Sequence, residues 1–227
     1  MSEFLKGFED PAAVQRYAEN PPRYMPGYAD MQRMAAVLLA EHAPDDGTLL
    51  VLGAGGGLEM KAFAELQPRW RFVGVDPAPE MLKLAQATLG SEASRAEWVE
   101  GYIDNAPTGP FDGAACLLTL HFLDSAERLR TLKEMRRRLV PGAPFVAAHS
   151  SFPQEPGQRE VWLRRYAEFA IAKGADPAHA YQAHRAVGDN LDLLSPEADA
   201  ELMREAGFRD VELFYAAFTW RGWVGLA

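Results

Sequence analysis

A glycine-rich turn directly after an apolar run constrains the fold of this chain more than any other feature. Residues 48–53 read TLLVLG, and the turn continues to Gly57 with three further glycines and one alanine. Such an apolar run is typical of a strand buried on both faces of a parallel sheet. Glycines let the backbone approach a ligand closely because they have no Cβ, and the helix expected over residues 58–67 would direct free N–H groups at the turn. The pattern predicts a strand, a ligand-binding turn and a helix.

Strands and helices alternate along the rest of the chain. The periodicity of apolar residues predicts strands at 70–76, 97–103, 111–120 and 143–150, and helices at 29–42, 78–89, 125–139 and 197–208. This alternation favours a doubly wound sheet with helices on both faces. Ser125 is the expected N-cap of the helix that follows it. Residues 211–227 alternate without a helix between their halves, which indicates an antiparallel hairpin at the sheet edge.

The composition excludes several classes of protein. Lys and Arg number 23 against 32 Asp and Glu, a net charge of −9, which argues against a protein that coats nucleic-acid phosphates, although a local basic patch is left open. Cys116 is the only cysteine, so we expect no disulfide framework, a reducing compartment and no thiolate metal site. No apolar run is long enough to cross a membrane, and residues 1–10 lack the basic start and the apolar run typical of a signal peptide. We therefore expect a cytoplasmic protein with neither a metal nor a membrane partner.

The spacing of the glycines and one acid indicates which ligand the turn binds. Asp76 ends the second predicted strand, 19 residues after Gly57, where a carboxylate can accept hydrogen bonds from both hydroxyls of a ribose. A dinucleotide fingerprint, G-x-G-x-x-G, needs a glycine where Leu58 stands. The pattern present is G-x-G-x-G, which begins at Gly53 and Gly55. The chain thereby resembles the class I S-adenosylmethionine (SAM)-dependent methyltransferases over nearly its whole length, and the terminal hairpin also belongs to their sheet.

Three segments resemble the branch of that superfamily that contains carboxy-SAM synthase, an enzyme of tRNA wobble-uridine modification. They are residues 25–28 (MPGY), residues 118–123 (LTLHFL) and the tail from Glu205 to Phe214. The resemblance implies cofactor contacts in the glycine turn, at the ribose and at the adenine, and Asp104 could accept from the adenine amino group. The candidate cofactor-binding residues are Tyr28, Gly53, Ala54, Gly55, Asp76, Pro77, Met81, Tyr102, Ile103, Asp104 and Leu118.

Some positions depart from the family pattern. Many class I enzymes carry an acid two residues before the first glycine, where this chain has Val51. Tyr102 replaces an adenine-contacting acid, Leu117 replaces an asparagine of the branch, and its carboxylate-reading arginine aligns near Arg185 only with a one-residue gap. We therefore favour a SAM-dependent methyltransferase with a small-molecule acceptor, releasing S-adenosylhomocysteine (SAH). The alternatives are a carboxy-SAM synthase-like enzyme and a non-catalytic cofactor-binding interaction protein.

The order of the elements and the resemblance together predict an α/β fold, a Rossmann-like doubly wound sheet, mostly parallel, with an antiparallel C-terminal hairpin strand. Residues 151–195 are too long for a plain loop, and we expect them to form a helical cap. We interpret residues 1–227 as one domain. Its parts are an N-terminal helical arm (1–45), a cofactor-binding core (46–150), a helical cap insertion (151–195), and the last helix with the terminal hairpin (196–227). The arm and the cap are candidate surfaces for a homodimer.

Methyl transfer from a sulfonium needs alignment of the acceptor, the methyl carbon and the sulfur, and a general base helps when the acceptor carries a proton. His121, just past the fourth predicted strand, is the candidate catalytic base, with a packing role as the alternative. The candidate substrate-binding residues, at the end of the fifth strand and in the cap, are His149, Trp162, Tyr166 and Arg185. For each of them a role in packing or a solvated position is the alternative.

Overall fold

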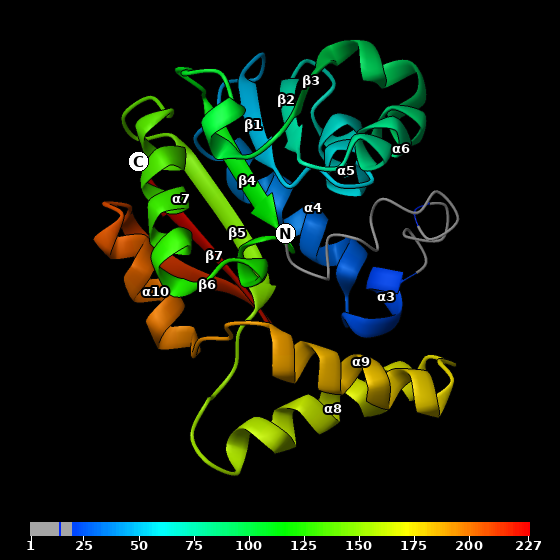
Figure 1. Ribbon diagram of the computed structural model, residues 1–227. Helices are drawn as coiled ribbons and strands as arrows, with labels where there is room; N and C mark the ends of the chain where they lie inside the picture. The colour runs from blue at the N-terminus through cyan, green and yellow to red at the C-terminus, as the bar shows by residue number, and fades with distance from the viewer. Residues whose placement is uncertain (1–13, 15–19) are drawn as a thin grey trace.

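A seven-stranded sheet with the order β3-β2-β1-β4-β5-β7-β6 forms the centre of the computed structural model, which describes Val14 and residues 20–227 (Figure 1). The strands are β1 (Thr48–Leu52), β2 (Arg71–Asp76), β3 (Ala96–Glu100), β4 (Gly113–Leu117), β5 (Pro144–Ser150), β6 (Arg209–Ala217) and β7 (Trp220–Leu226). The first five pair in parallel, and β7 runs antiparallel between β5 and β6. The predicted fold class is confirmed, including the antiparallel C-terminal strands.

Helices cover both faces of the sheet. They are α3 (Asn20–Tyr24), α4 (Tyr28–Ala40), α5 (Leu58–Leu66), α6 (Pro79–Leu89), α7 (Ser125–Arg137), α8 (Gln158–Ala172), α9 (Pro177–Asn190) and α10 (Pro196–Glu205). Successive residues of a strand point to opposite faces, so Leu49 and Val51 pack in the core beneath α4 and α5, while Leu50 and Leu52 pack in the core beneath α7 and α10. This double burial explains why the apolar run of β1 is continuous.

Two predicted strands are shorter than the sequence indicated. The third ends at Glu100 because Gly101 has a φ of +140°, which a residue with a side chain rarely adopts, and a short 3-10 helix (Ile103–Asn105) follows. The fourth ends at Leu117, and a second short 3-10 helix (Leu120–Phe122) follows. In both places the chain leaves the sheet earlier and turns across the carboxyl end of the strands.

The N-cap of α7 is Asp124, and the prediction of Ser125 was wrong. The Asp124 carboxylate accepts the backbone N–H of Glu127 at 2.9 Å. The backbone N–H of Ser125 instead donates to the Asp192 carboxylate at 2.8 Å, a contact across 67 residues of sequence.

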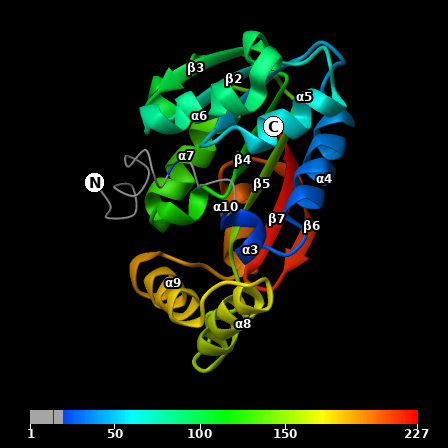
Figure 2. The ribbon, with the colours of Figure 1, turned by 90° about the vertical axis from the view of Figure 1, so that its right-hand side faces the viewer.

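The segment predicted as a cap contains the antiparallel helices α8 and α9. Figures 1 and 2 show them as a separate pair beyond the carboxyl ends of β4 and β5, and α3 contacts α8. The ring of Tyr166 in α8 stacks on that of Tyr24 in α3 with 5.0 Å between centroids. No helix within the described part of the chain is both long and apolar enough to cross a membrane.

A buried arginine of α7 links three segments on the other side of the sheet. The guanidinium of Arg128, with no exposed surface, donates to the carbonyl oxygens of Leu120 and Leu123, both at 3.1 Å. It also donates to the carbonyl oxygen of Asp192 at 2.8 Å and to the carboxylate of Asp199 in α10 at 2.6 Å. A buried charge is stable only when it is paired and hydrogen-bonded, as this one is.

Replacing Arg128 by methionine should lower the free energy of unfolding by about 3–5 kcal/mol, because Asp199 is left buried without its cation. Urea denaturation measures this change. Arg204→Met removes only the exposed pair with Glu201 and should leave the midpoint almost unchanged. Equally small effects of both substitutions would contradict the role of Arg128.

Candidate active site

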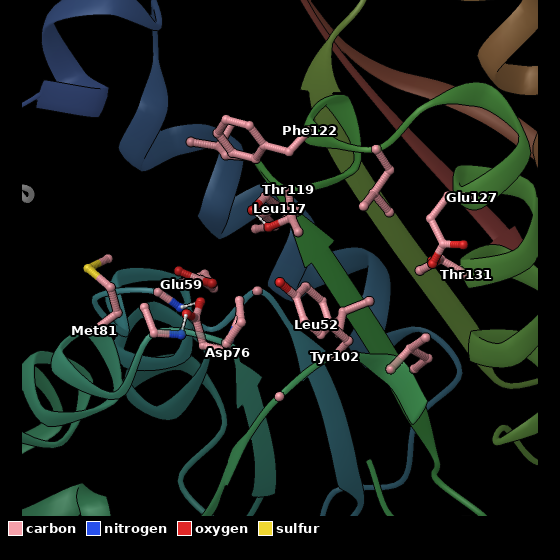
Figure 3. A pocket seen from close by; sticks show the side chains of 18 of the residues that line it. Leu52, Glu59, Asp76, Met81, Tyr102, Leu117, Thr119, Phe122, Glu127 and Thr131 are labelled. Carbon is pink, nitrogen blue, oxygen red and sulfur yellow. Dashed lines mark hydrogen bonds between the residues drawn. The ribbon is translucent and has the colours of Figure 1, made fainter. Parts of the chain in front are cut away.

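A cavity lies at the carboxyl ends of β1, β2 and β4 (Figure 3). It encloses about 140 Å³. It is lined by Tyr28, Leu52, Gly53, Gly55, Glu59, Asp76, Pro77, Ala78, Met81, Gly101, Tyr102, Ile103, Leu117, Leu118, Thr119, Phe122, Leu123, Glu127 and Thr131. Its walls are mostly apolar, with carboxyl groups at a few points.

The glycine turn forms one edge of this cavity. The backbone N–H groups of Gly53 and Ala54 both donate to the carbonyl oxygen of Val75, at 2.8 and 3.0 Å, which fixes the turn against the end of β2. Gly53 has a φ of +72°, and a Cβ there would lie 2.0 Å from the Thr119 hydroxyl oxygen. Glycine is therefore required at position 53 by both the backbone conformation and the close approach of the loop after β4.

Asp76 joins the glycine turn to the start of α6. One carboxylate oxygen accepts the backbone N–H of Gly55 and the other that of Ala78, both at 2.9 Å (Figure 3). Burial raises the pKa of Asp76, and these two hydrogen bonds, which favour the ionised form, oppose that rise. An ionised carboxylate has about four acceptor positions, so two remain for hydroxyl groups of a ligand.

Glu59 is a second carboxyl group on the cavity wall, and sequence analysis missed it. It lies in the first turn of α5 and is only 7% exposed. Burial raises its pKa to about 8, and the Asp76 carboxylate adds to that rise. An acid in the first turn of a helix is usual because it stabilises the N-terminus, so its position in the sequence did not distinguish it.

Nine of the eleven candidate cofactor-binding residues line this one cavity. They are Tyr28, Gly53, Gly55, Asp76, Pro77, Met81, Tyr102, Ile103 and Leu118. Ala54 does not line it and is fully buried. Asp104 does not line it either, because its carboxylate is held outside by two hydrogen bonds of 2.9 Å from Arg130. Leu118 has a φ of +57°, a strained conformation for a residue with a side chain, at the point where the chain leaves β4 for the cavity.

His121 and His149 lie in the interior, away from the cavity. His121 is 5% exposed, and its Nδ1 accepts the backbone N–H of Ser150 at 3.3 Å. Burial lowers the pKa of His121 well below its usual range, and His149 and Arg128 lower it further. His149 Nε2 lies 3.1 Å from the Asp199 carboxylate. This geometry does not support His121 as the catalytic base or His149 as a substrate contact, because neither ring reaches the cavity.

The three candidate substrate-binding residues of the cap are also outside the cavity. Tyr166 stacks on Tyr24, and the guanidinium groups of Arg165 and Arg221 lie over the Trp162 ring, 4.4 and 5.4 Å from its centroid. Arg185 is exposed on α9. Helical spacing correctly placed aromatic side chains on a common face, but that face packs within the cap and against its neighbours instead of lining the cavity.

Comparison with known proteins finds similarity to methyltransferases and to carboxy-SAM synthases. The profile of a methyltransferase domain family matches residues 49–142. The chain is 28% identical to the carboxy-S-adenosyl-L-methionine synthase of Chromohalobacter salexigens, over 91% of this chain and 78% of that protein. It is 31% identical to the demethylmenaquinone methyltransferase of Lactiplantibacillus plantarum, over 79% of this chain and 76% of that one. An O-methyltransferase family protein from Burkholderia thailandensis has a similar solved structure, with a TM-score of 0.73 at 16% identity over 99% of this chain and 62% of that chain.

The sheet order, the glycine turn and these relatives define the class, and the chain belongs to the class I SAM-dependent methyltransferases. Its cofactor is SAM, and the product is SAH. The predicted family, the enzyme class and the cofactor are thereby confirmed.

Substituting Asp76 by asparagine should weaken SAH binding by about 10- to 100-fold, because hydrogen bonds to a charged group contribute roughly 1.5–3 kcal/mol. Isothermal titration calorimetry measures the affinity, and thermal unfolding checks that the variant folds. Unchanged affinity in a folded variant would show that Asp76 does not contact the ligand.

A comparison of two glycine substitutions should isolate the contact between the turn and Thr119. Gly53 and Gly157 both have positive φ, but a Cβ on Gly157 meets no atom within 4 Å. Gly157→Ala should cost only the roughly 1–2 kcal/mol of left-handed strain, whereas Gly53→Ala should cost more and also weaken SAH binding. Equal losses of stability in urea denaturation would contradict the required close approach.

Proposed function

We propose that this enzyme transfers the methyl group of SAM to a small-molecule acceptor by in-line displacement. The observation that carries the proposal is the single cavity that joins the glycine turn to Asp76 at the carboxyl ends of β1 and β2. When bound, the cofactor supplies a methyl group activated by its sulfonium. The residues that line the cavity would hold the cofactor and align the acceptor with that methyl group.

Positioning is the contribution that the chain makes to this reaction. In the proposed arrangement Asp76 accepts hydrogen bonds from the ribose, and Tyr102 and Ile103 contact the adenine. Tyr28, the first residue of α4, and Phe122, in the 3-10 helix after β4, also line the cavity. Correct alignment alone can supply up to roughly 7–11 kcal/mol of barrier reduction.

Three observations favour a small acceptor that needs no histidine base. The net charge of −9 disfavours nucleic acid. The name of one relative gives demethylmenaquinone, a small molecule, as its acceptor. The cavity wall, within the described residues, contains no histidine. The cytoplasmic location and a homodimer built on the arm and the cap stay predictions.

A second candidate function is carboxy-SAM synthesis, which the relative at 28% identity favours. Carboxy-SAM carries one more carboxylate than SAM, and a site that binds it needs a cationic side chain to pair with that carboxylate. Arg185 is exposed on α9, and among the described residues no lysine, arginine or histidine lines the cavity. The charges of the wall therefore support SAM over its carboxylated form.

Native mass spectrometry of the freshly purified protein, followed by mass analysis of the released ligand, distinguishes the two functions. We expect SAM or SAH. A ligand heavier than SAM by one carboxylate would favour the second candidate, and a protein that neither carries nor takes up SAM or SAH would contradict both. Screening small-molecule acceptors for SAH formation then tests methyl transfer directly.

A further inference from the structure

The cavity holds two buried carboxyl groups without a cationic side chain. Glu59 and Asp76 are 7% and 8% exposed, and both line the wall (Figure 3). The Asp76 carboxylate accepts two backbone N–H groups, but no ion pair or hydrogen bond from another side chain reaches Glu59 in the described part of the chain. Burial of an ionised carboxyl group is costly unless it gains a partner. The Glu59 carboxylate has a hydrogen bond from its own backbone N–H, and the structure leaves a cationic partner to the ligand.

We propose that Glu59 binds the ammonium group at the amino acid end of the cofactor and is the residue that selects for that end. This inference rests on the proposed function, since it assigns one part of the SAM site. An ammonium donates three hydrogen bonds, whereas a sulfonium has no N–H or O–H to donate, so the ammonium is the cation that a carboxylate can hold by charge-assisted hydrogen bonds.

Glu59 also compensates for the missing acid at position 51, where many class I enzymes have an acid and this chain has Val51. The Val51 side chain packs in the core formed with Met60 and Phe63 of α5. Glu59 comes from this same helix and therefore from the same side of the sheet. The chain thus lacks an acid at the end of β1 but presents one from the first turn of α5, at the cavity wall.

Binding of an ammonium should change the protonation of Glu59. The groups around it do not supply a positive charge: Asp76 at the end of β2 and Cys116 in β4 interact with it electrostatically, and Tyr28 of α4 lines the same cavity. Lys61 in α5 is exposed and two residues along the helix, a spacing at which side chains do not face each other. Below pH 8 the empty enzyme therefore holds Glu59 largely protonated, the ammonium favours the carboxylate, and binding releases the proton. Affinity should rise as the pH rises to about 8 and level off above it.

The test compares SAH with 5′-methylthioadenosine, which keeps the adenosine and the thioether sulfur but lacks the amino acid. Calorimetry at pH 7 in two buffers of different ionisation enthalpy measures the protons released. We expect about one proton per SAH bound and none for 5′-methylthioadenosine. SAH affinity should increase at least tenfold between pH 6 and pH 8, with a smaller change for the nucleoside. Titration of Asp76 would affect both ligands, because both carry the ribose.

Glu59→Gln should weaken SAH binding at least tenfold, abolish its proton release, and leave 5′-methylthioadenosine affinity unchanged. Glu65→Gln, the same substitution on an exposed position of α5, is the matched control and should behave as the wild type. Equal proton release for both ligands in the wild type would overturn the proposal without any variant. Unchanged SAH affinity in Glu59→Gln would overturn it while the proposed function stands. Failure of the wild type to bind either ligand would instead overturn the proposed function.

Discussion

The buried carboxylate of Asp76 is the interaction on which the site depends. It accepts one backbone N–H from Gly55 and one from Ala78, so the glycine turn, the end of β2 and the start of α6 share a single anion. A buried carboxylate must find donors, and these donors fix the two turns before a ligand enters. Such preorganisation lowers the ordering cost of binding. Within the described wall, the polar groups around the turn then favour a ligand with hydroxyl groups and positive charge.

Much of the fold could be predicted from the sequence because its signals are local. Parallel strands buried on both faces must be continuously apolar, and the glycine at position 53 is required by both its positive φ and the close approach of Thr119. The predictions were wrong where contacts between residues far apart in the sequence determine the local structure. Ser125 was expected to cap α7, but Asp124 is the N-cap. The backbone N–H of Ser125 instead donates to the carboxylate of Asp192, in the segment after α9. No pattern near position 125 contains that information.

The same distinction separates the candidate site residues. Those that follow directly from a strand end or from the glycine turn line the cavity, because parallel strands bring their carboxyl ends to one edge of the sheet. His121 also follows a strand, yet its ring lies in the interior near Arg128 and His149. The aromatic side chains of α8 pack on Tyr24 of α3 and on Trp220 and Phe218 at the terminal hairpin. Side-chain direction beyond a strand end depends on such packing. Glu59 was missed because an acid in the first turn of a helix is common, and nothing in the sequence around it indicates that this one is buried.

The contacts of Arg128 join two parts of the enzyme that have different tasks. Leu120 and Leu123 belong to the loop that borders the cavity, while Asp192 belongs to the segment through which the two cap helices rejoin the core. Both segments lose a hydrogen-bond donor if this guanidinium moves. We therefore expect the loop that borders the cavity and the segment around Asp192 to unfold locally as one unit. A ligand that stabilises this loop would also stabilise the segment that joins the cap to the core, without contacting α8 or α9.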